Sequence, residues 1–385
     1  MFEIKIAALL FSVYAPLSWL IAMIMSGIHK KPIKRHLMLL MAAASFVYIM
    51  TYAKFQGHLD FYTVLFPIQA LAVPLLFPLF YLYFRTITSE KVEYNWKYFI
   101  HYAMPILLSI IYLIISKIWM NDEEEKRFMI NLLNGKLLEG SKFVFGYYFF
   151  GFGRLYYLLS SIFYLILISR CYSKYRVLIL NIFPTDYTKE LNWVKGIGFL
   201  LFGVAILNIV IHYMRNNNLA SHELLIAVSY FTFGAFFYIL GLYGFRQKEV
   251  YNTAEIVKTE NFKEDVRILK KDIEDYLMRS KIYLNSDINI YHLCNTFKTN
   301  RTYLSAEINK QFGMNFRYLI NSYRIQEAKK LIAQAKEKET VSNFEQIAID
   351  SGFNSYGSFL RVFKMMENVS PSKFYKTIEK YKRQE

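Results

Sequence analysis

Long apolar runs recur through the first 245 residues of the chain, and no run of that length follows them. A helix needs about 20 predominantly apolar residues to cross ~30 Å of hydrocarbon. The runs place membrane spans near residues 6–28, 36–53, 62–84, 98–118, 147–169, 193–214 and 223–244. The first run carries no charge and is followed by no small-residue cleavage site, so we interpret it as a retained span rather than a signal peptide. The pattern predicts a seven-span transmembrane domain over residues 1–245.

The connections between these runs differ in their Lys and Arg content, and cytoplasmic loops carry the excess of basic residues. The first, third and fifth connections hold most of the bases: Lys30, Lys31, Lys34, Arg35, Arg85, Lys91, Lys97, Arg170, Lys174, Arg176, Lys189 and Lys195. The second and sixth carry only Lys54 and Arg215, and the fourth balances its bases with the acids at 122–125. We therefore expect a multi-pass protein of the bacterial cytoplasmic (inner) membrane, with its N-terminus outside and its C-terminal domain in the cytoplasm.

From Arg246 onward the composition becomes that of a globular domain with a basic balance. This region has 25 Lys and Arg against 18 Asp and Glu, a net charge of +7. Residues 246–261 show no strong periodicity and are predicted to be a cytoplasmic linker, which leaves 262–385 as the C-terminal domain. From Phe262 to Leu277 apolar residues recur in steps of four and three, the pattern of an amphipathic helix. That helix is either the packed first helix of the domain or a coiled-coil seam of a homodimer.

Residues 287–312 have the pattern of a helix, a tight turn and a second helix. Asp287 is predicted to cap the first helix, which ends near Phe297. Asn300 is a favourable cap for the second helix, and Gly313 is a favourable stop because glycine adopts the left-handed backbone that often ends a helix. This arrangement is typical of a helix-turn-helix unit.

Residues 343–366 repeat that pattern, with Gly352 in the turn and Ser355 as the cap of the second helix. Between the two units, apolar residues at helical spacing predict a helix from about Asn315 to Ala335. Such a helix, at 1.5 Å per residue, is about 32 Å long, close to the ~34 Å of one turn of B-DNA. Two recognition helices held by it could enter successive major grooves on one face of the duplex.

A series of motifs in the tail stands in the register of a known family of regulators. The motifs are Asn300-Arg301-Thr302-Tyr303-Leu304-Ser305, Gly313-Met314-Asn315-Phe316, Tyr323-Arg324 with Glu327-Ala328, Gln346-Ile347-Ala348, Gly352-Phe353, Phe359-Leu360-Arg361-Val362-Phe363-Lys364, and Val369-Ser370-Pro371 followed by Tyr375. On these motifs, roughly residues 265–378 resemble the AraC/XylS family of transcription regulators. The resemblance implies an AraC-type domain of two helix-turn-helix units joined by a long linker helix. Together with the seven apolar runs it predicts an all-α chain, in which a seven-helix transmembrane bundle precedes that domain.

The resemblance also implies which residues contact DNA. By analogy, the base-edge candidates are Arg301, Thr302 and Ser305 in the first recognition helix and Tyr356, Ser358 and Arg361 in the second. Arg can bind guanine through two hydrogen bonds, Ser and Thr can donate or accept, and Tyr can touch a thymine methyl group. The phosphate candidates, which would position the protein without specifying sequence, are Lys298, Lys310, Lys364 and Lys373. The alternative for each base-edge candidate is a solvated or phosphate-contacting side chain.

Two positions depart from the family pattern. Asn368 stands where the family usually has Gly before its Val-Thr-Pro-like motif, and Asn tolerates the left-handed backbone that ends a helix. Ala306 occupies a position of the first recognition helix that often carries a base-reading polar residue. Fewer direct base contacts are therefore expected from the first half-site.

Arg154 is the most informative polar residue of the predicted spans. A charge inside a membrane is expensive and usually faces the bundle interior, so it suggests a functional site. Backbone carbonyls, Gln69, Asn208, tyrosine hydroxyls or an anionic ligand could satisfy it, and the alternative is a side chain that extends toward the membrane surface. Pro67, Pro74 and Pro78 are predicted to kink or break the third span, which either shapes a cavity or only makes the packing irregular.

The remaining chemistry of the sequence argues against an enzyme. Cys171 and Cys294 are far apart and have no metal-like spacing. The sequence shows no pair of carboxylates within the spans, no His cluster at ligand spacing and no nucleophile motif. We therefore expect no catalytic site, no cofactor and no metal.

The patterns together favour a membrane-bound one-component transcription regulator. It would bind double-stranded DNA through its tail while anchored in the lipid bilayer, under the control of an unknown signal molecule at the membrane domain. The first alternative is a membrane receptor whose helical tail binds a protein partner rather than DNA. A second alternative is a transporter or enzyme with an autoregulatory tail.

Overall fold

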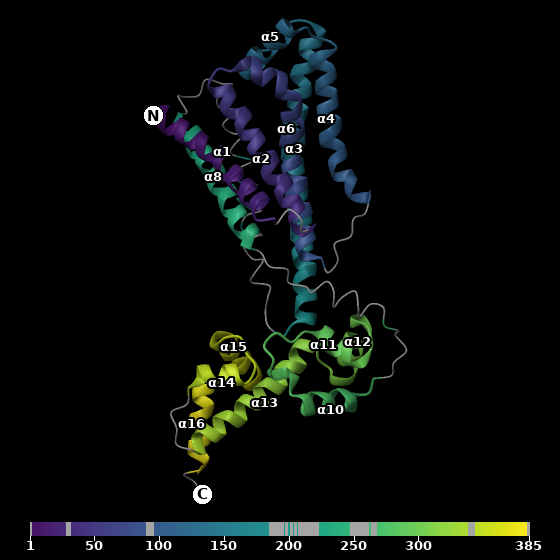
Figure 1. Cartoon of the computed structure of the whole chain (residues 1–385), viewed down its shortest axis with the longest axis vertical. Helices are drawn as coiled ribbons and strands as arrows, with labels where there is room; N and C mark the ends of the chain where they lie inside the picture. Colours follow the sequence, from purple (N-terminus) through teal and green to yellow (C-terminus); the bar gives the residue numbers. More distant parts are fainter. Residues whose placement is uncertain are drawn as a thin grey trace. The chain divides into compact units, whose positions relative to one another are not determined.

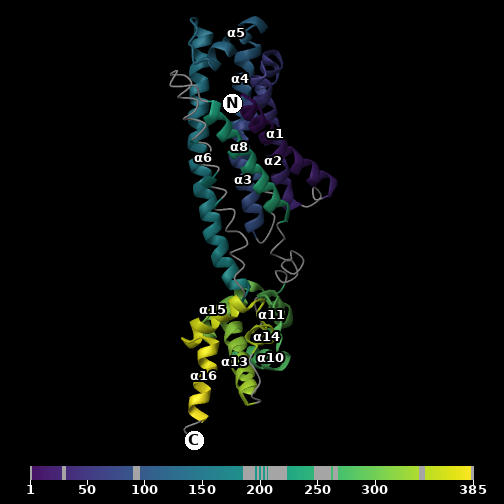
Figure 2. The same cartoon turned by 90° about the vertical axis from the view of Figure 1, so that its left-hand side faces the viewer.

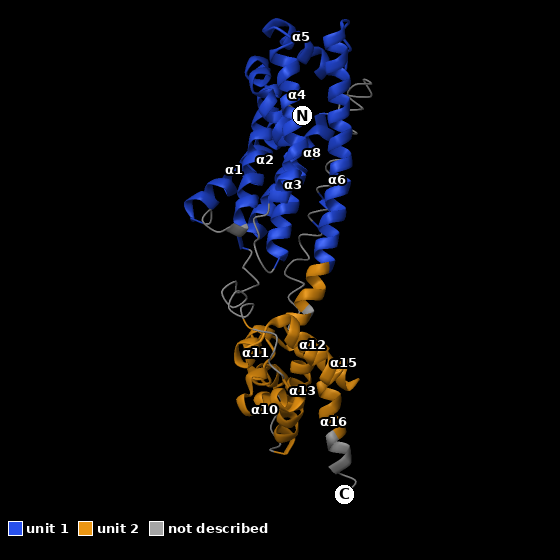
Figure 3. Ribbon diagram, turned by 90° about the vertical axis from the view of Figure 1, so that its right-hand side faces the viewer, with its two compact units in different colours: residues 1–173, 192–250 blue, residues 174–191, 251–385 orange. Residues whose placement is uncertain are grey.

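The computed structural model describes residues 2–27, 32–89, 96–184, 223–246, 262, 268–337 and 343–382, together with a few separate residues between 196 and 206. Every regular element in these ranges is a helix, which confirms the all-α prediction. The chain divides into two compact units (Figure 3), of which residues 1–173 and 192–250 form the N-terminal domain. Residues 174–191 and 251–385 form the C-terminal domain.

Six helices of the described residues are long and apolar enough to cross a membrane. They are α1 (Phe2–Met25), α2 (Pro32–Phe55), α3 (Leu59–Thr88), α4 (Ile100–Lys117, after a 3₁₀ turn at Trp96–Phe99), α6 (Ser141–Ile182) and α8 (Glu223–Arg246) (Figures 1 and 2). They correspond to six of the seven predicted spans. The predicted span at 193–214 lies almost entirely outside the described residues, as does most of the predicted linker at 246–261.

Two helices of this domain differ from the sequence prediction. The helix α6 has 42 residues and begins at Ser141, well before the predicted boundary at 147, and it continues past 169. The helix α3 is unbroken although it contains Pro67, Pro74 and Pro78, so the predicted break is wrong. Prolines are tolerated inside apolar helices of this kind. Ser109 Oγ of α4 donates a 2.7 Å hydrogen bond to the Pro67 carbonyl and so links α4 to α3.

Glycines let α8 pack closely against α1. A Cβ atom on Gly234 would collide with the ring of Phe11, and a Cβ atom on Gly241 would collide with the ring of Trp19. Near the end of α8, the buried Lys34 Nζ at the start of α2 donates a 2.6 Å hydrogen bond to the carbonyl of Gly244. Carbonyls of a last helical turn have no partner within the helix. The lysine therefore satisfies one of these carbonyls of α8 and links α8 to α2.

The helix α5 (Asp122–Leu133) lies in the connection between α4 and α6, where no helix was predicted. Asn121 and Glu124 begin it with a capping box, in which the Asn121 side chain accepts from the Glu124 N–H at 2.9 Å. Lys126 Nζ, on α5, is 2.7 Å from Asp60 of α3. The apolar side of α5 packs into a cluster that includes Phe128, Tyr112 and residues of α2 and α3. The N-x-x-E spacing was the sequence signal for this helix.

The C-terminal domain contains α10 (Lys270–Ser280), a 3₁₀ turn at Ile282–Leu284, α11 (Ile290–Phe297), α12 (Arg301–Phe312), α13 (Phe316–Glu337), α14 (Phe344–Asp350), α15 (Tyr356–Glu367) and α16 (Pro371–Lys382). Figures 1 and 2 show α13 running from the group formed by α10, α11 and α12 to the group formed by α14, α15 and α16. The predicted linker helix at 315–335 is therefore confirmed.

The first helix of this domain starts later than its apolar pattern suggested. The prediction placed its start at Phe262, but Leu269 has an extended backbone and α10 begins at Lys270. The apolar residues Ile273 and Leu277 are fully buried within the chain, and the Tyr276 ring lies 5.6 Å from that of Phe297. The structure thus supports a packed first helix of the domain, since Ile273 and Leu277 are covered within the chain; Leu269, which belongs to the same apolar pattern, is exposed.

Candidate functional sites

The first helix-turn-helix unit consists of α11 and α12. Asn289 caps α11 by accepting from the Tyr291 N–H at 2.9 Å, so the prediction that Asp287 caps it is wrong. After α11, Lys298 has a left-handed backbone with φ 52°, and the Thr299 N–H donates to the Cys294 carbonyl at 3.1 Å. This pattern of bonds ends a helix and turns the chain.

The helix α12 begins and ends at the residues that its sequence predicted. Asn300 caps it by accepting from the Tyr303 N–H at 2.9 Å, and Gly313 ends it with φ 68°. Leu304 and Ile308 are fully buried and hold its inner face. The opposite face, which includes Thr302 and Ala306, is exposed.

The second helix-turn-helix unit consists of α14 and α15. Gly352 forms the turn with φ 88°, and the Phe353 N–H donates to the Ala348 carbonyl at 2.9 Å. Ser355 caps α15 by accepting from the Ser358 N–H, and Asn368 ends α15 with φ 57°. The predicted stop at this asparagine is confirmed, because the left-handed backbone survives the departure from glycine.

Arg324 of α13 contacts residues next to both helix-turn-helix units. Its guanidinium is fully buried, and it donates to the carbonyls of Tyr283 (2.7 Å) and Asn285 (2.8 Å), just before the first unit. It also lies 5.5 Å from the ring centre of Phe353, in the turn of the second unit. A buried arginine must satisfy its donors inside the protein, so this side chain fixes the segment before α11 against the turn between α14 and α15.

The predicted base-edge residues of the first recognition helix lie in its first two turns. Thr302 is exposed, and Arg301 and Ser305 are half-buried. Arg301 is close enough to the buried Cys294 to affect its ionisation. The structure therefore brings the three predicted residues together at the N-terminal end of α12, where the recognition helix of a helix-turn-helix unit contacts base edges.

The second recognition helix presents its predicted residues differently. Arg361 is exposed on α15, whereas Tyr356 is half-buried and packs against the core around Phe359. The Ser358 hydroxyl donates to the Ser355 carbonyl at 2.8 Å and so belongs to the helix cap. Arg361 is consequently the most accessible of the three for a base or a phosphate.

The predicted phosphate-contacting residues Lys298, Lys310, Lys364 and Lys373 are all exposed. Lys298 lies at the turn of the first unit, and Lys364 lies in the last turn of α15. The Lys310 Nζ is 3.8 Å from Glu307, a weak surface pairing that a phosphate could replace.

The thiol of Cys294 is expected to be unreactive in this position. Burial raises the pKa of its thiol from 9.0 to about 12, while nearby Arg301 opposes part of that rise. Because the thiolate is the reactive form of cysteine, this buried side chain acts as a small apolar residue of the first unit.

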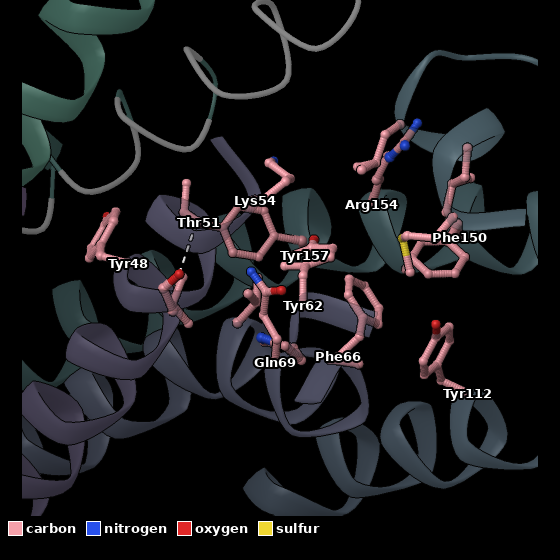
Figure 4. A pocket seen from close by; sticks show the side chains of 18 of the residues that line it. Tyr48, Thr51, Lys54, Tyr62, Phe66, Gln69, Tyr112, Phe150, Arg154 and Tyr157 are labelled. Carbon is pink, nitrogen blue, oxygen red and sulfur yellow. Dashed lines mark hydrogen bonds between the residues drawn. The ribbon is translucent and has the colours of Figure 1, made fainter. Parts of the chain in front are cut away.

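In the N-terminal domain, Arg154 lines a cavity of about 440 Å³ (Figure 4). The walls come from α2, α3, α5, α6 and α8, with short contributions from α4. Lys54 and Gln69 line the same cavity, and sequence reasoning had not connected Lys54 with Arg154 because it assigned that lysine to a connection between spans. The helix α2 continues to Phe55, which places Lys54 within it.

Comparison with known proteins agrees with the geometry of the C-terminal domain. Residues 293–377, which extend from within α11 into α16, match a helix-turn-helix domain family. The TCP pilus virulence regulatory proteins of two Vibrio cholerae serotype O1 strains, classical Ogawa 395 and El Tor Inaba N16961, are each 39% identical to the chain over 82 residues. The similarity covers 21% of this chain and 28% of each relative, so the chain spans less than a third of the length of these relatives. No solved structure matches the chain.

The chain therefore carries an AraC-type helix-turn-helix domain at its C-terminus. The similarity includes both helix-turn-helix units and the helix between them, which is the combination that the sequence motifs predicted. This module is the DNA-binding part of transcription regulators of that type.

Proposed function

We propose that the protein is a membrane-bound one-component transcription regulator that binds promoter DNA through its two helix-turn-helix units. The observation that carries this proposal is the pair of complete units at the two ends of α13. The helix α13 runs from Phe316 to Glu337, and its 22 residues are about 33 Å long at 1.5 Å per residue. One turn of B-DNA has about the same length, which supports insertion of α12 and α15 into successive major grooves.

The membrane part of the proposal rests on composition and on the continuity of α6. Six apolar helices in the described residues have the length and hydropathy of membrane spans, and the basic connections favour a cytoplasmic tail. The helix α6 belongs to the N-terminal domain up to Ser173, and its last turns group with the C-terminal domain. There, Asn321 Nδ2 of α13 donates to the Pro184 carbonyl at 3.2 Å.

A gel-shift titration tests DNA binding. Residues 255–385 are incubated with DNA from upstream of the protein's own gene, and with a scrambled duplex, at several salt concentrations. We expect a sequence-preferring complex whose affinity falls with salt, because lysine and arginine contacts release counterions from DNA. The absence of both sequence preference and salt dependence would reject DNA binding.

Substitution of Arg361 tests base contact against phosphate contact. We expect Arg361→Ala to weaken the specific complex about tenfold or more while changing nonspecific binding less, because a two-bond contact to guanine contributes about 1–3 kcal/mol of discrimination. Lys310→Ala is the matched control and should weaken both complexes to the same extent. An equal loss for Arg361→Ala would assign that residue to a phosphate.

A helical tail that binds a protein instead of DNA is the second candidate function. The observation that favours it is the exposed Ala306 on α12, at a position suited to a polar base contact. This alternative predicts that the 255–385 fragment ignores DNA in the titration described above and co-purifies with a cytoplasmic protein instead.

A further inference from the structure

The cavity of the N-terminal domain has a largely aromatic lining. Its volume of about 440 Å³ falls in the range of about 300–1,000 Å³ that is typical of small-molecule sites. Among the residues that the structure describes, ten aromatic side chains line it: Tyr48, Phe55, Tyr62, Phe66, Tyr112, Phe149, Phe150, Tyr157, Tyr230 and Phe233. Some already pack ring to ring, as Phe66 does with Tyr112 at 4.6 Å and with Phe150 at 5.3 Å. A planar aromatic body would extend this packing, since aromatic pairs gain energy beyond their buried area.

The charges along the cavity all have one sign. Lys54 of α2 and Arg154 of α6 line it, and none of the described residues around it is Asp or Glu. Figure 4 shows these two side chains along one edge of the cavity, with Phe66 and Tyr112 across from them. A pair of cations beside an apolar pocket favours an anion, because attraction between charges is stronger where water is largely excluded.

Gln69 adds an independent polar feature inside the cavity. Its side chain is only 8% exposed, and its Oε1 atom has no hydrogen-bond partner among the described residues. A buried acceptor without a hydrogen-bond partner destabilises the folded protein. A ligand with a hydroxyl or N–H group beside its charge would satisfy this oxygen.

We propose that this cavity binds a small aromatic carboxylate, with the rings among the aromatic side chains and the carboxylate beside Lys54 and Arg154. This inference rests on the proposed sensing role of the membrane domain and names the chemical class of its signal. The helix α5 covers part of the cavity through Met129 and Leu132, and ion pairs at Lys117–Glu125 (2.6 Å) and Lys126–Asp60 (2.7 Å) hold that helix in place.

Two glycines of α6 provide a matched pair of variants. Gly153 lines the cavity, and a Cβ atom built on it meets no other atom within 4 Å. Gly151 also has free space around its Cβ position but does not line the cavity. Gly153→Leu should therefore place a side chain in the ligand's volume, and Gly151→Leu should leave that volume unchanged.

Photolabelling of the full-length protein tests the site directly. The protein is placed in nanodiscs of zwitterionic lipid and irradiated with 4-benzoylbenzoate, an aromatic carboxylate that cross-links on illumination, or with its neutral amide. We expect saturable labelling by the acid on peptides of α2, α3 or α6, and at least tenfold less labelling by the amide. Removing both cations (Lys54→Gln with Arg154→Gln) should lower labelling by the acid about tenfold or more, since hydrogen bonds to charged groups are stronger than those between neutral groups.

The controls separate the site from folding and from DNA binding. Arg170→Gln, on the same helix but away from the cavity, and Gly151→Leu should label like the unchanged protein, whereas Gly153→Leu should abolish labelling. Equal labelling by acid and amide, labelling that survives removal of both cations, or labelling elsewhere would overturn the proposal. The assay contains no DNA, so failure of promoter binding leaves its outcome intact. Conversely, labelling that succeeds while Gly153→Leu leaves a promoter reporter unchanged would keep the site and reject sensing.

Discussion

The two helix-turn-helix units make the same turn with different residues because the two turns lie in different surroundings. Lys298 and Gly352 hold corresponding places, and both have a left-handed backbone, with φ 52° and 88°. Lys298 is exposed. Gly352 is buried, and a Cβ atom there would lie 2.6 Å from the Tyr283 carbonyl oxygen and 2.8 Å from the Leu284 Cα.

The difference shows that the turn at Lys298 only reverses the chain locally, whereas the turn at Gly352 also packs against another segment of the domain. The first turn needs a residue that tolerates a left-handed backbone. The second also needs a residue without a side chain, since the backbone just before the first unit passes directly over it. Together with Arg324, this contact sets the position of the second unit against the first. Substitutions that affect the two turns unequally therefore test the comparison.

Gly352→Ala should have the largest effect. We expect it to lower the free energy of unfolding of residues 255–385 by about 4 kcal/mol, from left-handed strain of about 1–2 kcal/mol and overpacking of about 1–3 kcal/mol. Urea denaturation measures this loss. Gly357→Ala is the control, because that glycine lies within α15 with free space around it and should gain up to about 1 kcal/mol. A loss below about 1 kcal/mol at Gly352 would contradict the close contact.

Arg324→Ala should follow, with a loss of about 3 kcal/mol. The substitution leaves the buried Tyr283 carbonyl without its donor, which costs about 1–3 kcal/mol. It also removes the hydrogen bond to the Asn285 carbonyl and the contact with the Phe353 ring. The same denaturation experiment applies, with Lys330→Ala as the control because Lys330 is exposed on the same helix. Comparable losses for the two variants would mean that the buried guanidinium does not hold the second turn.

The parts of this comparison differ in how far the sequence predicts them. Asn300, Gly313 and Ser355 were predicted as helix ends, since capping depends on a residue and its neighbours a few positions away. The role of Arg324 was not predicted, because arginine is rarely fully buried and its partners lie about 40 residues earlier in the chain.

The N-terminal domain shows the same limit. Apolar length predicted the six described helices that could cross a membrane, and it placed their ends within several residues except for α6, which continues well past 169. The cavity depends on Lys54, Gln69 and Arg154, which lie on three different helices. Only the packing of those helices brings the three residues to one place, and a hydropathy pattern carries no information about that packing.

Cys294 of the first unit and Ala348 of the second hold corresponding positions. Both side chains are buried, and both carbonyls accept the hydrogen bond that closes the turn of their unit. The folded pKa of Cys294, about 12, exceeds its ordinary value of 9.0. Its contribution to stability is therefore complete below pH 9 and is lost as pH rises from 9 toward 12. The stability advantage of the natural protein over Cys294→Ala should shrink by about 1.4 kcal/mol between pH 8 and pH 10. Urea denaturation at both pH values measures it, and a constant difference would mean that the thiol is not buried.

The helix caps should differ less. Asn300→Ala should lower the free energy of unfolding by about 1 kcal/mol, and Ser355→Ala by about half as much. The reason is geometric, since Asn300 accepts at 2.9 Å whereas Ser355 accepts at 3.3 Å and shares its hydroxyl with Ser358. Urea denaturation of both variants checks which cap contributes more to stability. Thr302→Ala is the control, because Thr302 lies on α12 but does not cap it. The reverse order would show that the second unit depends more on its cap than on its buried turn.

Lys298→Gly should have the smallest effect on stability. Its expected direction is also opposite to that of Gly352→Ala. Glycine removes left-handed strain of about 1 kcal/mol but adds about 0.5–1 kcal/mol of freedom to the unfolded chain, so we expect stability to stay equal or rise by a few tenths of a kcal/mol. If Lys298 also contacts a phosphate, the slope of log affinity against log salt should fall by about one in gel shifts. Lys298→Asn keeps a residue that tolerates this backbone and should give the same loss of slope, which separates charge from backbone. A clear loss of stability in Lys298→Gly would mean that the first turn, like the second, is held by contacts of its own.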